Sequence, residues 1–193
     1  MQTGTQKGIV LVKFQVDKAV SRFSVQAFAT GLLSSFGHNP TIAIRDYHTE
    51  IQCIPVTCEK AYIRVTVQTS EMEILDEMKR DDRTRMEQEM YDKVLDVRHY
   101  PTALYESNQI TVQKMASDAF RANIDGQLSF HGTTQSLPLQ ANVSLIGTSL
   151  RISGNFTLRQ SDYGIKPVSV AAGALRLKDE LKFTFDLVAR RQD

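Results

Sequence analysis

Histidine and aspartate side chains are the first places in this sequence to look for chemistry. The four histidines could act as bases or metal ligands: His38, His48, His99 and His131. No two have the spacing of a local metal pair, and histidines near strand edges are more often partly buried structural residues. His38, within Phe36-Gly37-His38-Asn39-Pro40, is the most suggestive. One alternative for function is therefore an enzyme that uses His38, His131 or Asp162 on a small hydrophobic substrate.

Motifs that would turn these residues into an active site are missing. The sequence has no Gly-x-Ser-x-Gly elbow, no phosphate loop and no dinucleotide-binding glycine pattern. We interpret Asp81-Asp82 as the solvated start of a helix and Ser161-Asp162-Tyr163-Gly164 as a turn. Because nothing assembles a nucleophile, a base and an orienting group, we expect no catalytic residue, metal site or cofactor.

The two cysteines, Cys53 and Cys58, lie five positions apart across a short loop. Two cysteines make no disulfide framework, and a zinc site would need two further ligands nearby. We expect free or incidental thiols.

The elements that must position any site are mostly strands. From Phe120 to Phe130 the even positions are apolar or small and the odd positions polar; after His131–Gln135 the pattern resumes on odd numbers from Leu137 to Leu145. A period of two predicts a strand with one dry face. Two such strands around a glycine-containing connector predict an antiparallel hairpin.

The same alternation recurs along most of the chain. It predicts further strands over residues 10–16, 23–29, 42–51 (with a bulge near Asp46), 61–67, 102–107, 109–113, 150–158, 174–177 and 181–188. Residues 71–96 differ, because they lack Gly and Pro and carry apolar residues at helical spacing. A capping box at Thr84–Glu87 predicts a helix start there, with Glu71–Arg80 a separate turn or short helix. The methionines of this segment either pack the helix on the sheet or line a site for an apolar ligand.

Eight or more amphipathic strands with one helical insert predict an all-β fold, either a closed antiparallel barrel or a two-sheet sandwich. A barrel of about eight strands is just wide enough for one small ligand. Gly126 and Gly154, at inward positions, would leave room for a ligand or a bend.

Length and charge place the chain among ordinary globular domains. Its 193 residues carry a net charge of +1, which gives no reason to expect a nucleic acid or an anionic membrane as partner. No apolar run is long enough for an integral membrane segment or a signal peptide. We therefore expect one domain over residues 1–193 and a cytoplasmic location, or a periplasmic one if a leader was removed.

Four segments resemble, in order, motifs of the YceI-like, lipocalin-like proteins. Gly126–Leu139 is similar to their "G-D-L-T-I-x-G-V-T-K-P-V-x-L" segment, and Tyr100–Ser107 is similar to their "Y-P-x-I-x-F-x-S" strand. Arg83–Leu95 is similar to the helix that precedes this strand, and Ser161–Ile165 is similar to their "R-S-D-F-G-M" loop. The resemblance spans about residues 14–188. The family's early "D-x-x-H-S" reads Asp17–Ser21 without the histidine, and the arginine expected before Ser161 is replaced by Gln160.

The resemblance implies an antiparallel lipocalin-like β-barrel of about eight strands, in bacterial proteins that bind long isoprenoid chains. We therefore expect a non-catalytic protein that holds an isoprenoid, a prenyl quinone or a similar long apolar amphiphile, as a monomer or homodimer. The phases of the strands predict eight cavity-lining residues: Phe23, Val25, Leu128, Phe130, Leu139, Phe156, Phe183 and Phe185. A second alternative is a solid-core barrel that acts through its surface as a stress-related interaction protein.

Overall fold

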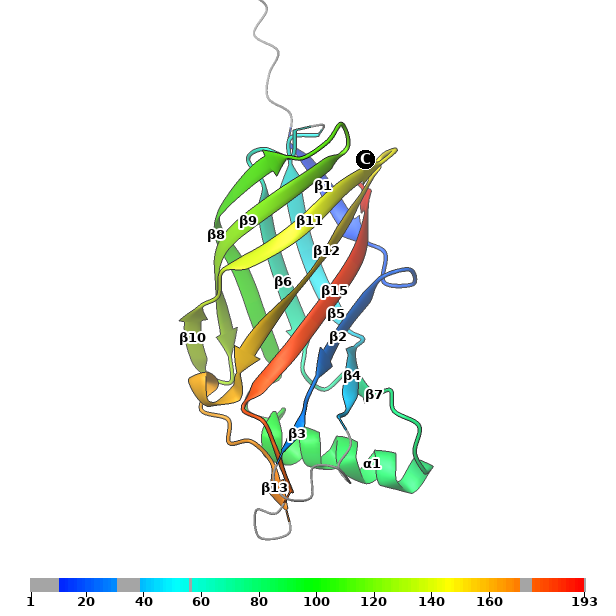
Figure 1. The fold of residues 1–193 in the computed structure, drawn as a ribbon, viewed down its shortest axis with the longest axis vertical. Helices are drawn as coiled ribbons and strands as arrows, with labels where there is room; N and C mark the ends of the chain where they lie inside the picture. Colours follow the sequence, from blue (N-terminus) through cyan, green and yellow to red (C-terminus); the bar gives the residue numbers. More distant parts are fainter. Residues whose placement is uncertain (1–10, 31–38, 56, 171–174, 193) are drawn as a thin grey trace, which may run out of the picture.

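The computed structural model describes residues 11–30, 39–55, 57–170 and 175–192. Its main sheet closes on itself as an antiparallel barrel, in the order β1-β5-β6-β8-β9-β11-β12-β15 and back to β1 (Figure 1). These strands are β1 (Val12–Val16), β5 (Tyr47–Cys53), β6 (Tyr62–Gln68), β8 (Thr102–Lys114), β9 (Ala119–Phe130), β11 (Leu139–Ile146), β12 (Ser149–Arg159) and β15 (Glu180–Arg191). The predicted fold class, an all-β antiparallel barrel with a helical insert, is confirmed.

Three further strands extend the barrel wall toward its lower end. They are β2 (Arg22–Gln26), β4 (Thr41–Ile44) and β7 (Met72–Ile74), which follow in that order from β15. Strand β15 is long enough to pair with β1 through Ala189–Arg191 and with β2 through Lys182–Asp186. The predicted irregularity near Asp46 is the break between β4 and β5, so this wall bends where the sequence changes phase.

The helix lies across the lower end of the barrel (Figure 1). It runs as α1 (Arg80–Glu89) and continues as one π-helical turn, η2 (Met90–Val94). The predicted start at Thr84 is wrong: the N-cap is Lys79 and has no side-chain cap hydrogen bond. Glu87, the expected capping partner, instead accepts a hydrogen bond from the backbone N–H of Ile74 at 3.0 Å.

The helical insert is also shorter than the expected residues 71–96, because Met72–Ile74 forms strand β7. The edge pairing of β7 with β4 overrides the helical spacing of this segment. Contacts to β7 and the segment after it then anchor the helix. The hydroxyl of Tyr91 donates to the carbonyl of Met72, and Arg83 donates to the carbonyl of Asp76 at 2.8 Å.

The predicted hairpin is confirmed by the antiparallel pairing of β9 with β11, which sets Leu139 opposite Ile124. Its connector is more ordered than expected, since β10 (Thr133–Ser136) folds back on β9 through a tight turn at His131 and Gly132. The two segments predicted at 102–107 and 109–113 form one strand, β8, with a register shift between Ser107 and Gln109.

A small second sheet lies below the barrel. It has the order β13-β14-β3 and consists of β3 (Ala29–Thr30), β13 (Ser169–Val170) and β14 (Leu175–Leu177). Between β12 and this sheet the chain makes one turn of 3-10 helix, η3 (Gln160–Tyr163).

The upper half of the barrel, at the end away from α1, is a packed core. Its buried side chains are at most 8% exposed and include two phenylalanines: Val12, Phe14, Val16, Ile51, Cys53, Cys58, Phe120, Ala122, Val143, Leu150 and Ala189. Partly buried Ile110, Val112 and Leu145 pack against this core. Cys53 and Cys58 are free thiols here, as predicted. Burial of this kind supplies the main stabilisation of the fold.

Candidate ligand cavity

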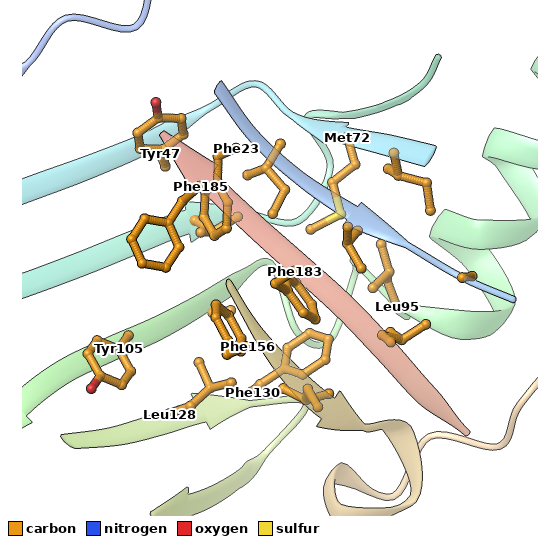
Figure 2. A pocket seen from close by; sticks show the side chains of 18 of the residues that line it. Phe23, Tyr47, Met72, Leu95, Tyr105, Leu128, Phe130, Phe156, Phe183 and Phe185 are labelled. Atoms are coloured by element: carbon orange, nitrogen blue, oxygen red, sulfur yellow. The ribbon is translucent and has the colours of Figure 1, made fainter. Parts of the chain in front are cut away.

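The lower half of the barrel encloses an apolar cavity of about 300 Å³. Its wall is formed by the inward side chains of the strands (Figure 2). The helical segments α1 and η2 add Met86, Met90 and Val94. A volume of this size lies at the low end of the range for small-molecule sites. The cavity therefore has room for one apolar ligand of modest size.

All eight residues predicted from strand phase line this cavity: Phe23, Val25, Leu128, Phe130, Leu139, Phe156, Phe183 and Phe185. The strand register explains why they meet, because Phe23 lies opposite Phe185, and Phe183 opposite both Val25 and Phe156. That they contact a ligand remains a prediction.

Aromatic rings make one side of the wall continuous. Phe156 and Phe183 stack with ring centroids 4.7 Å apart and planes 5° from parallel, while Phe23 contacts Tyr47 edge to face at 5.8 Å. Offset-stacked and edge-to-face arrangements are the favourable geometries for aromatic pairs. The rings support one another without a ligand, so the wall is largely preformed.

The inner end of the cavity is closed by a ring of six side chains, one from each of six strands. This inner ring consists of Tyr47, Tyr105, Ile124, Ala141, Ile152 and Leu187, all of which line the cavity and are less than 9% exposed. Figure 2 shows Tyr47, Phe185 and Tyr105 at the end of the cavity farthest from the helix. Burial raises the pKa of Tyr105 to about 12, so its hydroxyl is neutral at physiological pH.

Two glycines allow aromatic rings to lie flat on the inner wall. A Cβ at Gly126 would lie 2.4 Å from the Tyr105 hydroxyl oxygen, and one at Gly154 would lie 2.7 Å from the ring of Phe185. The room expected at these glycines is thus taken by aromatic side chains of the protein itself, and the expectation that it serves a ligand is wrong. The Tyr105 hydroxyl is fixed by donating to the carbonyl of Leu137 at 3.2 Å.

Helix residues close the opposite end. Met86, Met90, Val94 and Leu95 line the cavity, and Met86 is 37% exposed, so it touches solvent as well. The structure thus combines the two interpretations of the methionines: they pack the helix over the barrel end and they form part of the cavity wall. Unbranched thioether side chains adapt readily to the shape of a neighbour.

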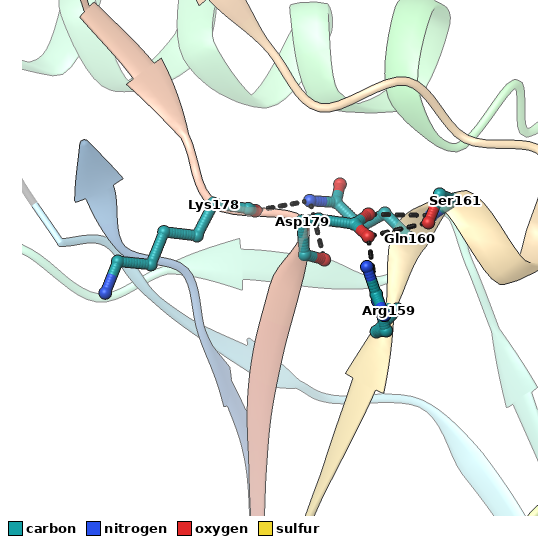
Figure 3. A network of polar contacts seen from close by, with 5 residues as sticks. All are labelled: Arg159, Gln160, Ser161, Lys178 and Asp179. Atoms are coloured by element: carbon teal, nitrogen blue, oxygen red, sulfur yellow. Dashed lines mark hydrogen bonds and ion pairs between the residues drawn. The ribbon is translucent and has the colours of Figure 1, made fainter. Parts of the chain in front are cut away.

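Polar groups are few on the described wall. Apart from two tyrosines, they are the exposed Glu89, which pairs with Lys93 at 3.1 Å, and Gln160, which is 3% exposed. Gln160 belongs to a network that joins β12 to β15 at the lower end (Figure 3). Its Nε2 donates to the carbonyl of Lys178 at 3.0 Å.

Asp179 is the centre of this network. Its carboxylate accepts hydrogen bonds from the Ser161 hydroxyl at 2.6 Å, the Ser161 backbone N–H at 2.8 Å and Arg159 at 3.2 Å. The Ser161 hydroxyl is the main cause that lowers the pKa of Asp179. Arg159 therefore binds a carboxylate of the protein itself, and Gln160 takes the buried position that the resemblance assigns to arginine.

His131 and Asp162, the two described residues of the enzyme alternative, are not among the residues that line the cavity. His131 donates from Nδ1 to the carbonyl of Tyr163 at 3.2 Å, and its ring packs against that of Tyr100 with the centroids 4.1 Å apart and the planes tilted by 40°. The side chain of Asp162 is exposed, and its carbonyl accepts from Gln135 at 3.4 Å. In this arrangement His131 holds a turn together. His38 lies outside the described residues.

Sequence reasoning missed part of the wall. The contributions of β4, β6 and β7 include Ile42, Ile63, Val65 and Ile74. The alternation at Ile63 and Val65 could have indicated their inward direction. No local pattern could have placed Gln160, because its burial depends on the pairing of β12 with β15.

No helix among the described residues has the length and apolar character needed to cross a bilayer. Together, the closed antiparallel barrel, the apolar cavity at one end and the helix across that end define a lipocalin-like barrel with a cavity inside it.

The chain belongs to the YceI-like family, since its sequence matches the model of the YceI-like domain over residues 14–189. Its structure is similar to that of Burkholderia cenocepacia BcnA, with a TM-score of 0.69, 16% identity, and coverage of 90% of this chain and 98% of that one.

Two other solved structures share this fold. A polyisoprenoid binding domain from Saccharophagus degradans, implicated in plant cell wall breakdown, gives a TM-score of 0.66 at 12% identity and covers 94% of this chain and 99% of that one. The Campylobacter jejuni YCEI protein gives a TM-score of 0.63 at 15% identity, and the match covers 81% of this chain and 88% of that one. A comparison with curated proteins finds no match.

Proposed function

We propose that this protein is a non-catalytic carrier that holds an isoprenoid or a similar apolar amphiphile in the lower half of its barrel. The observation that carries the proposal is the cavity itself, whose described wall is apolar except for Gln160, Glu89 and two tyrosine hydroxyls. A wall of this composition recognises hydrocarbon by excluding water from it. The barrel fold shared with a polyisoprenoid binding domain supports the same ligand class.

The energetics favour such a ligand. Each methylene transferred from water into the cavity contributes about 0.8 kcal/mol, before the cost of ordering the chain. Because the aromatic pairs already support one another, little of this gain is lost to rearranging the protein. Neutral head groups suit the lower end, where the Arg159 charge is paired with Asp179 and that of Lys93 with Glu89. A prenyl alcohol or a prenyl quinone has the required chemistry.

Native mass spectrometry of freshly purified protein tests the proposal directly. We expect a co-purifying lipid, and uptake of a short-tailed prenyl quinone by delipidated protein at micromolar concentration. If no lipid is present and the delipidated protein takes up neither prenol nor prenyl quinone, the carrier function is wrong.

A blocking variant gives the matched control. Ala103→Trp places an indole in the cavity wall and should reduce uptake at least tenfold, whereas Ser136→Trp adds the same group at an exposed position and should leave uptake unchanged. The chain has no native tryptophan, so the fluorescence of each variant reports on its own site. Equal uptake by both variants would mean that the ligand binds elsewhere.

A further inference from the structure

The cavity occupies only part of the barrel, and this part has a definite inner boundary. The inner ring (Tyr47, Tyr105, Ile124, Ala141, Ile152 and Leu187) marks the last residue of each of these strands that faces the cavity. Beyond it the inward positions are filled, with Phe14 at 4%, Phe120 at 3% and Leu150 at 2% exposure. A chain that enters from the helix end therefore meets a packed core instead of a second opening.

The length of the cavity follows from strand geometry. On β15 the lining runs from Leu181 to Leu187, six residue steps, which is about 20 Å along a strand at roughly 3.3 Å per residue. With strands tilted by about 40°, this corresponds to about 15 Å along the barrel axis. An isoprene unit has four main-chain bonds and, at about 3.8 Å per three bonds, extends about 5 Å. The part of the cavity that β15 lines thus has the length of about three units, and lining residues outside β15, such as Met86, Val168 and Leu177, extend the cavity beyond this span at the helix end.

We infer that this protein selects short isoprenoid chains, of about three to four units, and that the Phe185 ring and the inner ring set the upper limit. The inference rests on the proposed carrier function. A longer chain would have to hold its remaining units in water at the helix end, whereas the unbound lipid shields them from water within its own aggregates, so each unit beyond about four should lower the affinity.

Phe185 is the side chain best placed to control this limit. Its ring lies at the inner end of the cavity, in the gap that Gly154 leaves on β12, and contacts Phe156 at a centroid distance of 6.5 Å (Figure 2). It is only partly buried, because one side of the ring faces the empty cavity. Removing the ring extends the cavity toward the packed core without touching the helix end.

A series of prenols of increasing length tests the inference. Delipidated full-length protein is titrated with farnesol, geranylgeraniol and solanesol, which have three, four and nine isoprene units, with native mass spectrometry as the readout. We expect farnesol and geranylgeraniol to bind at least tenfold more tightly than solanesol. Equal or tighter binding of solanesol would overturn the length limit while leaving the carrier function intact. Failure of every prenol to bind would overturn the carrier function itself.

Two phenylalanine variants then locate the limit. Phe185→Ala should shift the preference toward geranylgeraniol over farnesol by about fivefold. Phe120→Ala removes the same ring from the packed core and should leave the ratio unchanged, with circular dichroism confirming that each variant is folded. An unchanged ratio of the two affinities in a folded Phe185→Ala variant would show that Phe185 does not set the limit. If this variant does not fold, the same ratio is measured for Phe185→Leu, which keeps an apolar side chain, and an unchanged ratio has the same meaning.

Discussion

Phe120 and Phe130 lie on the same strand and face the same side of it, yet their surroundings differ. Phe120, in the upper half of the barrel, is 3% exposed and packs in the core. Phe130, in the lower half, is only partly buried, lines the cavity and contacts Tyr163 at 5.6 Å. The alternation of a strand therefore decides which side chains face inward, but not whether the space between them is filled.

The two halves also differ in what closes them. The upper half is closed by pairing of β1 with β15 and by side chains that meet across the axis. The lower half is closed by a helix whose residues are all at least partly exposed. Three hydrogen bonds, through Arg83, Glu87 and Tyr91, join this helix to β7 and the segment after it. Stability should therefore reside mainly in the upper half, and ligand binding in the lower half.

Matched leucine truncations should give the largest difference between the halves. Leu150→Ala, at a position 2% exposed, should lower the free energy of unfolding by about 3 kcal/mol, because it creates a cavity in a packed core. Leu128→Ala, at the wall of an existing cavity, should cost about 1 kcal/mol, since that side chain is not fully packed. Urea denaturation measures both. Equal losses would contradict the division into packed and hollow halves.

A methyl group at Gly126 tests the packing of the inner ring. The new Cβ would lie 2.4 Å from the Tyr105 hydroxyl and 2.7 Å from the carbonyl oxygen of Glu106, so Gly126→Ala should destabilise the fold by about 2 kcal/mol. Gly147→Ala is the control, because no atom lies within 4 Å of the Cβ that it would add. Only the backbone angle φ of +60° disfavours alanine there, so the free energy of unfolding should fall by about 1 kcal/mol. A smaller loss at Gly126 than at Gly147 would show that Tyr105 moves freely.

Acid should weaken the lower end through Asp179. Its lowered pKa, caused first by the Ser161 hydroxyl, means that the carboxylate stabilises the folded state above its unfolded pKa, near 4. This contribution is lost as the pH falls through the folded pKa. Asp179→Asn should lower the free energy of unfolding by about 0.5 to 1 kcal/mol at pH 7, allowing for solvent screening, and by much less near pH 2. Urea midpoints across this range measure the difference; a difference independent of pH would argue against the network.

Two buried threonines, one on β5 and one directly after β6, should respond in opposite directions. The hydroxyl of Thr49, 2% exposed, has no hydrogen-bond partner among the described residues, whereas that of Thr69, 0% exposed, donates to the carbonyl of Tyr100 at 2.8 Å. Thr49→Val should therefore stabilise the fold by up to about 1 kcal/mol, and Thr69→Val should destabilise it by about as much. Thermal melts of both variants check the sign, and a loss of stability at Thr49 would point to a bound polar group there.

Strand phase predicted much of the site, because inward direction is a local property. The alternation in five strands, among them Phe120–Phe130 and Leu181–Leu187, predicted the inward direction of eight side chains, and all eight line the cavity. The extent of the cavity was not predictable, since filling depends on which side chains meet across the barrel. That Gly126 accommodates Tyr105, and Gly154 accommodates Phe185, follows from pairing between strands and has no signature in either strand alone.

The helix region shows where local signals mislead. Thr84 and Glu87 have the spacing of a capping box, but Glu87 bonds to β7, and the helix begins one turn earlier. Likewise the helical spacing of apolar residues extends into Met72–Ile74, which forms an edge strand paired with β4. In both cases a contact distant in sequence outweighs a weak local preference.

The most direct test of the whole account is a crystal structure of delipidated protein loaded with farnesol. We predict continuous ligand density that starts beside Met90, passes the Phe156–Phe183 stack and stops at Tyr105 and Leu187. A lower half collapsed around its own rings, with farnesol absent or bound on the outside, would contradict the claim that this barrel is hollow at one end in order to hold a chain.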